Sequence, residues 1–133
     1  MKKISQIARK YPLTLLCIAL IWYLCVFFDM PETGLEDVPF IDKWTHFAMY
    51  GGTVSVMWAE YLRHHQKLNT ARLVIFAFFA PILMSGVIEL VQAYCTTNRQ
   101  GEWLDLAANS TGVVLGNAIG AMMFCILKNT RRK

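Results

Sequence analysis

Glu89 is an acidic residue inside a long apolar run, a position that is costly for a carboxylate. Between Ala71 and Cys95 the only charged residues are Arg72 and Glu89. A charged side chain well inside a membrane-spanning helix costs on the order of 2.5 kcal/mol or more. The cost falls when the group is protonated, meets water or pairs with a polar neighbour. Gln92 follows Glu89 by about one helical turn, so the two side chains can share one helix face.

Two other apolar segments begin with polar residues at helical spacing. Asp42, His46 and Tyr50 recur every four residues at the start of one segment. Asp105 and Asn109 have the same spacing at the start of another. Residues four apart lie on one side of a helix, so each segment has a polar face near one end. We therefore predict that these faces meet in one polar cluster.

A cluster of carboxylate, imidazole and amide groups could carry out acid–base chemistry or bind a polar headgroup. His46, Glu89 and Asp105 are the candidate catalytic residues, because a histidine and a desolvated carboxylic acid can exchange a proton with a substrate. The candidate ligand-binding residues are Asp42, Lys43, Tyr50, Gln92, Arg99 and Asn109. His, Asp and Glu could supply metal ligands. No metal-ligand spacing is present, however, so we predict neither a metal nor a cofactor.

The members of this cluster also have structural interpretations. Asp42 and Asp105 stand at expected helix starts, where N-capping and the helix dipole favour carboxylates. His46 could lie at a membrane interface, and Asn109 could join two helices by a hydrogen bond. Glu89 has no comparable explanation, so the set as a whole favours a functional site over a structural network.

A second acid, Glu60, lies near the end of its apolar segment. Arg63 and His64 follow it by three and four residues. At that spacing oppositely charged side chains are neighbours on a helix surface. We therefore expect Glu60 to form an ion pair at the membrane interface.

Four apolar segments must position these residues, with approximate bounds 12–28, 44–62, 71–95 and 104–127. Hydrophobic residues make up 56% of the chain and charged residues 17%, below the roughly one quarter charged that is usual in soluble domains. About 20 apolar residues cross a bilayer as a helix, which satisfies its backbone polar groups internally. We predict an all-α integral membrane bundle of four transmembrane helices, forming a single domain over residues 1–133.

The basic residues predict the orientation of this bundle. They gather before the first segment, between the second and third, and after the fourth; Lys43 and Arg99 are the exceptions. By the positive-inside rule both termini are cytoplasmic and the polar cluster lies near the outer surface. Trp44 and Trp103 then fall at the outer interface, and Trp58 falls near the inner one. The net charge of +4 follows from this topology, so no nucleic-acid partner is predicted.

Three glycines of the fourth segment, Gly112, Gly116 and Gly120, recur every four residues. Small residues at this spacing let two helix backbones approach closely. The main interpretation is close packing inside the bundle. The alternative is a homodimer formed through the same glycines.

These residues belong to a pattern that resembles the VanZ-like family, which is named for a teicoplanin-resistance protein. The matching stretches are D-K-W-T-H-F-A-M-Y (42–50), E-L-V-Q (89–92), Arg99 and D-L-A-A-N-S-T-G-V-V-L-G (105–116). The resemblance implies a small multi-pass protein of the bacterial cytoplasmic membrane, in the cell envelope. It also implies a link, in some members, to glycopeptide or lipoglycopeptide resistance, and it supplies no established reaction. Glu102 departs from the pattern, which leads us to expect a small or hydroxyl residue there.

Three functions are compatible with this sequence. The preferred one is a binding protein whose outer site takes a lipid headgroup, a lipid-linked cell-wall intermediate or a glycopeptide antibiotic. The first alternative is a membrane-embedded enzyme that uses His46 and Glu89 as an acid–base pair on a lipid-linked substrate. The second is a small proton-coupled transporter, which is disfavoured because the polar faces stop at the outer half of the helices.

Overall fold

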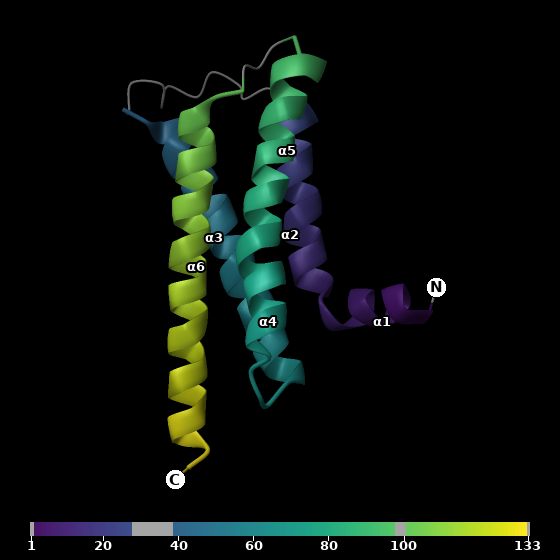
Figure 1. Ribbon diagram of the computed structural model, residues 1–133, viewed down its shortest axis with the longest axis vertical. Helices are drawn as coiled ribbons and strands as arrows, with labels where there is room; N and C mark the ends of the chain where they lie inside the picture. Colours follow the sequence, from purple (N-terminus) through teal and green to yellow (C-terminus); the bar gives the residue numbers. More distant parts are fainter. Residues whose placement is uncertain (1, 28–38, 98–100, 133) are drawn as a thin grey trace.

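The computed structural model of the chain describes residues 2–27, 39–97 and 101–132, and within these ranges it is helical with short turns and no strand. The elements are α1 (Lys2–Lys10), α2 (Pro12–Trp22), the π-helix η1 (Tyr23–Phe27), α3 (Ile41–His64), α4 (Thr70–Leu73), the π-helix η2 (Val74–Phe79), α5 (Ala80–Cys95) and α6 (Trp103–Thr130). Helices α2, α3, α5 and α6 run side by side along the long axis (Figure 1). The predicted all-α class is confirmed.

Two continuous helical segments of the described chain are long and apolar enough to cross a membrane. They are Thr70–Cys95, with 26 residues, and Trp103–Thr130, with 28 residues. A third appears if α1 and the following helix, bent by 89° at their junction, count as one span. Helix α3 has 24 residues, about 36 Å at 1.5 Å per residue, but it does not meet the same criterion of apolar composition. The chain therefore has the helices of a membrane protein, with two or three spans identified by length and composition.

The predicted glycine register of α6 lies against α3. A Cβ atom on Gly112 would collide with the backbone carbonyl of Phe47, and one on Gly116 would collide with that of Gly51. Gly120 faces a buried aromatic ring of α3. The close packing expected inside the bundle is therefore observed. A homodimer through the same glycines stays a prediction, and it would require α6 to separate from α3.

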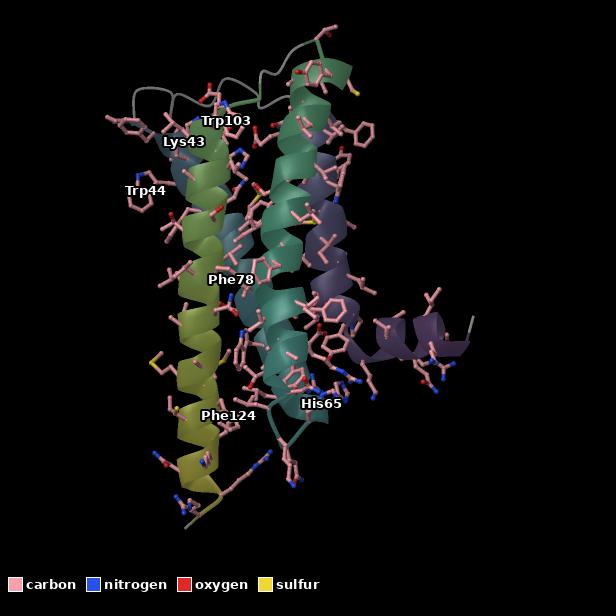
Figure 2. All side chains as sticks on the ribbon, viewed as in Figure 1. Lys43, Trp44, His65, Phe78, Trp103 and Phe124 are labelled. Atoms are coloured by element: carbon pink, nitrogen blue, oxygen red, sulfur yellow. The ribbon has the colours of Figure 1, made fainter. Side chains whose placement is uncertain are left out.

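The tryptophans occupy two different environments. Trp44 and Trp103 are exposed at the end of the bundle that carries Lys43 (Figure 2), where the outer interface is predicted. Trp58 is buried, and its indole Nε1 donates to Asn117 Oδ1 over 2.9 Å. Its ring packs inside the bundle, because Gly120 of α6 leaves room for it. That Trp58 falls near the inner interface stays a prediction.

Two π-helical turns supply backbone carbonyls to side chains of other helices. Gln92 Nε2 donates to the carbonyl of Cys25 in η1 over 2.7 Å, and Asn117 Nδ2 donates to that of Ala77 in η2 over 2.8 Å. A π-turn interrupts the regular α-helical hydrogen-bond pattern and is often found at functional sites. Here the two turns tie α2 to α5 and α5 to α6, and the first of them lies at the edge of the polar cluster.

Candidate functional site

A hydrogen-bonded chain of three buried side chains joins three helices at the centre of the site. Asn109 Oδ1 of α6 lies 3.2 Å from His46 Nδ1 of α3. Asn109 Nδ2 donates to Ser85 Oγ of α5 over 2.7 Å. Because the amide nitrogen is used by Ser85, Asn109 presents its oxygen to the imidazole, and this assigns the proton to Nδ1. In the neutral ring, Nε2 then carries the lone pair.

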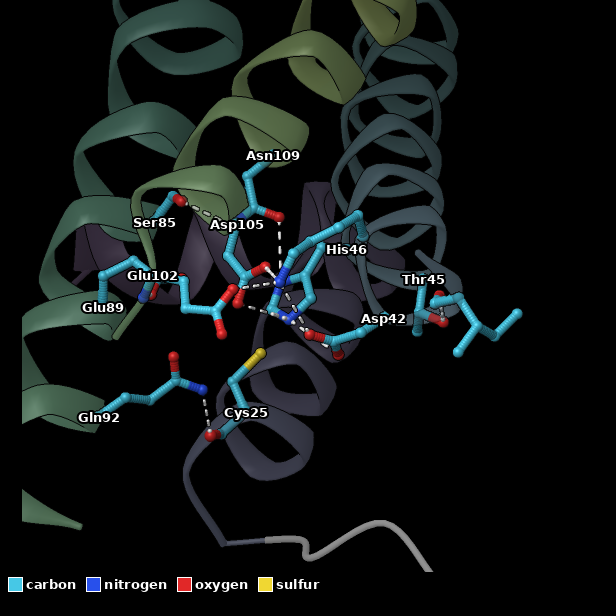
Figure 3. Close-up of polar contacts among 12 residues, drawn as sticks. Cys25, Asp42, Thr45, His46, Ser85, Glu89, Gln92, Glu102, Asp105 and Asn109 are labelled. Carbon is cyan, nitrogen blue, oxygen red and sulfur yellow. Dashed lines mark hydrogen bonds and ion pairs between the residues drawn. The ribbon is translucent and has the colours of Figure 1, made fainter. Parts of the chain in front are cut away.

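The Nε2 atom of His46 faces two aspartates across a small gap. It lies 3.7 Å from Asp42 Oδ1 and 3.8 Å from Asp105 Oδ2. Both separations exceed hydrogen-bond length. Figure 3 shows the three side chains pointing toward one another from α3 and α6. His46 and Asp105 are buried, with 3% and 7% of their side chains exposed, whereas Asp42 is 47% exposed. The site therefore opens to the surface on the Asp42 side.

Lys43 lies on the outer side of the same two carboxylates. Its Nζ is 2.5 Å from Asp105 Oδ1 and 3.4 Å from Asp42 Oδ2, the oxygens that do not face His46. It also lies 2.6 Å from Glu102 Oε2. Lys43 is thus engaged by three carboxylates, and its positive charge is already offset. The ligand-binding role of Lys43 stays a prediction.

Glu89 has one bonded oxygen and one without a described partner. Its Oε2 accepts the backbone N–H of Glu102 over 2.9 Å, at the N-terminus of α6, where a carboxylate is favoured by the helix dipole. Its Oε1 is buried and accepts no hydrogen bond from residues 2–27, 39–97 or 101–132. The Gln92 Oε1 atom is likewise buried and accepts no hydrogen bond from the described residues. A buried acceptor left without a donor costs about 1–3 kcal/mol.

The predicted site residues fall into three groups in the structure. Asp42, Lys43, His46, Asp105 and Asn109 are joined by direct contacts. Glu89 bonds to the start of α6, Gln92 bonds to η1, and Tyr50 is buried one turn from His46. Arg99 lies outside the described residues. That these groups bind or react with a ligand stays a prediction.

Two further residues of the cluster were not among the predicted site residues. Ser85 bonds to Asn109, and it precedes Glu89 by four residues, so helical spacing alone could have placed it there. Glu102 was noted only as a departure from the family pattern. In the structure its carboxylate pairs with Lys43 and its backbone N–H bonds to Glu89. Sequence spacing gives no signal for either contact, because both join residues from different elements.

Glu60 lies toward the opposite end of α3 and is bonded through both oxygens. Its Oε1 accepts the N–H of Leu13, and its Oε2 accepts both the N–H and the hydroxyl of Thr14, all within 2.7–2.9 Å. No ion pair within 4 Å joins it to Arg63 or His64 in the described chain. The expected ion pair is wrong. Glu60 instead caps the first turn of α2, whose N–H groups lack partners within their own helix.

An apolar cavity of about 640 Å³ lies between α2, α3 and the η2–α5 segment. It extends from Tyr11 and Arg72, near α4, to Tyr50, one helical turn from His46. Its walls are mainly aliphatic, as at Ile18 and Val54. Such a lining suits an apolar ligand.

No family model, no curated protein and no solved structure matches this chain. Its functional interpretation therefore comes from the geometry of the site. That site offers a proton acceptor at His46 Nε2 and buried hydrogen-bond acceptors at Glu89 and Gln92. It also holds two carboxylates that converge on the imidazole.

Proposed function

We propose that this chain is a multi-pass protein of the bacterial cytoplasmic membrane whose outward-facing polar site binds the headgroup of a membrane-embedded molecule. One observation carries the proposal: Glu89 Oε1 and Gln92 Oε1 are buried acceptors without a donor in the described chain. A purely structural polar network has nearly all its buried groups hydrogen-bonded. Two such acceptors in one cluster fit a site that a ligand completes.

The ligand that fits these acceptors supplies O–H or N–H donors. Sugar hydroxyls and peptide amides have them, and a lipid-linked cell-wall intermediate carries both on an apolar chain. The cavity that ends at Tyr50 offers volume for part of that chain. The resemblance to the VanZ-like family favours the same class of ligand. It also favours a glycopeptide antibiotic, which carries sugars and peptide bonds.

The proposal includes four membrane spans with both termini in the cytoplasm. Helix α3 crosses despite its polar composition because His46, Glu60 and other polar side chains are buried within the bundle. Lys43 and His65 mark opposite ends of α3 (Figure 2), and the C-terminus lies toward the His65 end (Figure 1). A fluorescent protein fused after Lys133 should fold and fluoresce in the cytoplasm, whereas an alkaline phosphatase fused there should be inactive. Active phosphatase at that position would contradict this topology.

The ligand class can be tested by native mass spectrometry of the purified full chain in nanodiscs. We expect a lipid-linked saccharide-peptide to be retained in preference to phosphatidylglycerol, which offers few donors. Gln92→Leu should weaken that retention about tenfold. The substitution removes one buried hydrogen bond between neutral groups of the protein and the ligand, which is worth about 1–2 kcal/mol. Gln66→Leu, at an exposed glutamine of the α3–α4 connection, is the matched control. Equal retention of all lipids by the wild type would refute the proposal.

A membrane-embedded enzyme is the second candidate, and the position of His46 favours it. Asn109 fixes Nδ1, while Nε2 is buried and makes no hydrogen bond within the described chain. A general base has this arrangement: one nitrogen is oriented and the other can take a proton from water or a hydroxyl group. If the chain is an enzyme, His46→Ala should abolish product formation in lipid extracts while the substrate is still bound. Lipid profiles that stay identical with and without the protein would exclude this candidate.

A further inference from the structure

Asp42, His46 and Asp105 bring three potential metal-ligand atoms together from two helices. One ligand atom from each residue lies within 4.8 Å of the other two. We infer that these three residues bind a divalent transition-metal ion of the zinc or manganese type. The inference deepens the proposed function, since it assigns a cation to the same site, and it requires no particular lipid.

The separations are close to those of a coordination site. Zinc–nitrogen and zinc–oxygen bonds of about 2.0–2.2 Å place the ligand atoms of a tetrahedral ion about 3.4 Å apart. His46 Nε2 is 3.7 Å from Asp42 Oδ1 and 3.8 Å from Asp105 Oδ2. On coordination each of these two separations would contract by a few tenths of an ångström. The three ligand atoms lie within 4.8 Å of one another, so the separation between the two aspartate oxygens would contract by up to about 1.4 Å. The half-exposed Asp42 can supply this movement by rotating its side chain.

The histidine is held as a metal-ligating histidine usually is. Such residues give their second ring N–H to a carboxylate, carbonyl or water, which fixes the ring and leaves the other nitrogen for the metal. The amide oxygen of Asn109 takes this role toward Nδ1, and Ser85 in turn fixes the amide. Only 3% of the His46 side chain is exposed. Its Nε2 points into the space between the two aspartates and makes no hydrogen bond in the described chain.

The net negative charge of the cluster also favours the binding of a cation. Lys43 supplies one positive charge to the carboxylates of Asp42, Asp105 and Glu102. If the three acids are ionised, the four side chains carry a net charge of −2, and Asp105 is the buried acid among them. A divalent ion supplies two positive charges. It can bind beside Lys43 because the lysine contacts Asp105 Oδ1 and Asp42 Oδ2, whereas His46 faces the other oxygens.

An imidazole nitrogen with two carboxylate oxygens favours zinc or manganese over calcium or magnesium, which prefer oxygen ligands alone. Three protein ligands leave at least one position open, as in catalytic zinc sites. The open position is on the side of Asp42, the exposed member of the set. A phosphate or hydroxyl oxygen of the proposed headgroup would meet the cation there. The ion would thereby provide the positive charge that the engaged Lys43 does not.

The test is metal binding by the purified full chain in nanodiscs, without any cell-wall lipid. After chelator treatment and dialysis, the protein is titrated with Zn²⁺ or Mn²⁺. The bound metal is measured by inductively coupled plasma mass spectrometry. We expect one equivalent per chain. His46→Ala and Asp105→Asn should each weaken binding by at least about tenfold. His64→Ala, at an exposed histidine of the same helix, is the matched control and should bind like the wild type. Asn109→Ala should weaken binding by about 10–100-fold, as expected for the partner of a metal ligand.

Two further measurements keep the result interpretable. Asp42→Asn changes the half-exposed ligand, so it should fold even if the buried variants do not, and it should also lose affinity. Co²⁺ added to the wild type should give the visible absorption of a tetrahedral site, and this absorption should be absent in His46→Ala. A stoichiometry that His46→Ala and Asp42→Asn leave unchanged would overturn the inference, and so would an absence of binding. Lipid retention measured in a chelator tests the proposed function separately, so the two can fail independently.

Discussion

Glu60 and Glu89 are buried acids that each bond to the N-terminal region of another helix, yet their environments differ. Glu60 accepts hydrogen bonds through both oxygens, from Leu13 and Thr14 at the start of α2. Glu89 accepts one, from Glu102 at the start of α6, and its second oxygen has no donor in the described chain. The two acids are therefore alike in burial and differ in the number of carboxylate oxygens that accept a hydrogen bond.

The surroundings of the two acids extend this contrast. Near Glu60 the neighbouring groups are the backbone and hydroxyl of one helix turn. The polar cluster around His46 holds a histidine, two aspartates and a lysine from two helices, with one imidazole nitrogen unbonded within the described chain. The first arrangement is complete without a ligand. Under our proposal, the second gains hydrogen bonds or charge balance from a ligand or cation.

The largest effect on stability is expected from Glu60→Ala. The substitution leaves the buried N–H of Thr14 and the partly buried N–H of Leu13 without acceptors, and hydrogen bonds to a charged group are worth about 1.5–3 kcal/mol each. We expect a loss of about 3 kcal/mol or more in the free energy of unfolding, against about 1.5 kcal/mol for Glu89→Ala, which loses one such bond. Unfolding in detergent, followed by tryptophan fluorescence, measures both. Equal losses would break the comparison.

A somewhat smaller effect is expected from Gly112→Ala, which tests whether α6 is fixed against α3 next to the site. The new Cβ would meet the backbone carbonyl of Phe47, which cannot move aside as a side chain can. Overpacking of this kind costs about 1–3 kcal/mol. Gly86→Ala is the matched control, because no atom lies within 4 Å of its added Cβ. It should be neutral or stabilising by up to about 1 kcal/mol. Equal effects of the two substitutions would contradict the close contact.

The smallest effect on stability, but a large one on the site, is expected from Ser85→Ala. It removes the hydroxyl that fixes the amide of Asn109, and a typical hydrogen bond contributes about 0.5–1.5 kcal/mol. The freed amide can rotate and offer its nitrogen to His46, which reverses the hydrogen-bond polarity at Nδ1. We expect near-normal unfolding together with a changed tautomer of His46, seen in the nitrogen chemical shifts of its imidazole in nuclear magnetic resonance spectra. Ser55→Ala, which removes only a bond to its own helix, should leave those shifts unchanged. Unchanged imidazole shifts in Ser85→Ala would show that Asn109 is oriented by something else.

The sequence predicted the elements and much of the cluster, because both follow from helical periodicity. The apolar runs gave α5 and α6, and the four-residue spacing of Asp42, His46 and Tyr50 placed them on one face of α3. We could predict that Asp105 and Asn109 face His46 because buried polar groups are nearly always hydrogen-bonded. These predictions depend on local spacing or on general rules of burial.

Contacts between distant residues could not be predicted in the same way. Glu60 bonds to residues 46 and 47 positions away, so its spacing to Arg63 suggested a different partner. The bond from Glu102 to Glu89 depends on how the chain between α5 and α6 returns, and no local pattern specifies it. A search for metal-ligand spacing in the sequence also could not find the three potential ligand atoms, because Asp105 comes from a different helix than Asp42 and His46.

The most direct test of the central claim compares the binding of a lipid-linked saccharide-peptide by Glu89→Gln and Glu60→Gln in identical nanodiscs. In Glu89→Gln the amide oxygen can still accept from Glu102, but the amide nitrogen then meets the donors of the ligand. We predict that the dissociation constant rises at least about tenfold, which corresponds to about 1.4 kcal/mol. For Glu60→Gln we predict a change below about twofold, provided that the protein folds. Equal dissociation constants for the wild type and Glu89→Gln would contradict the claim that the outer acid meets a ligand.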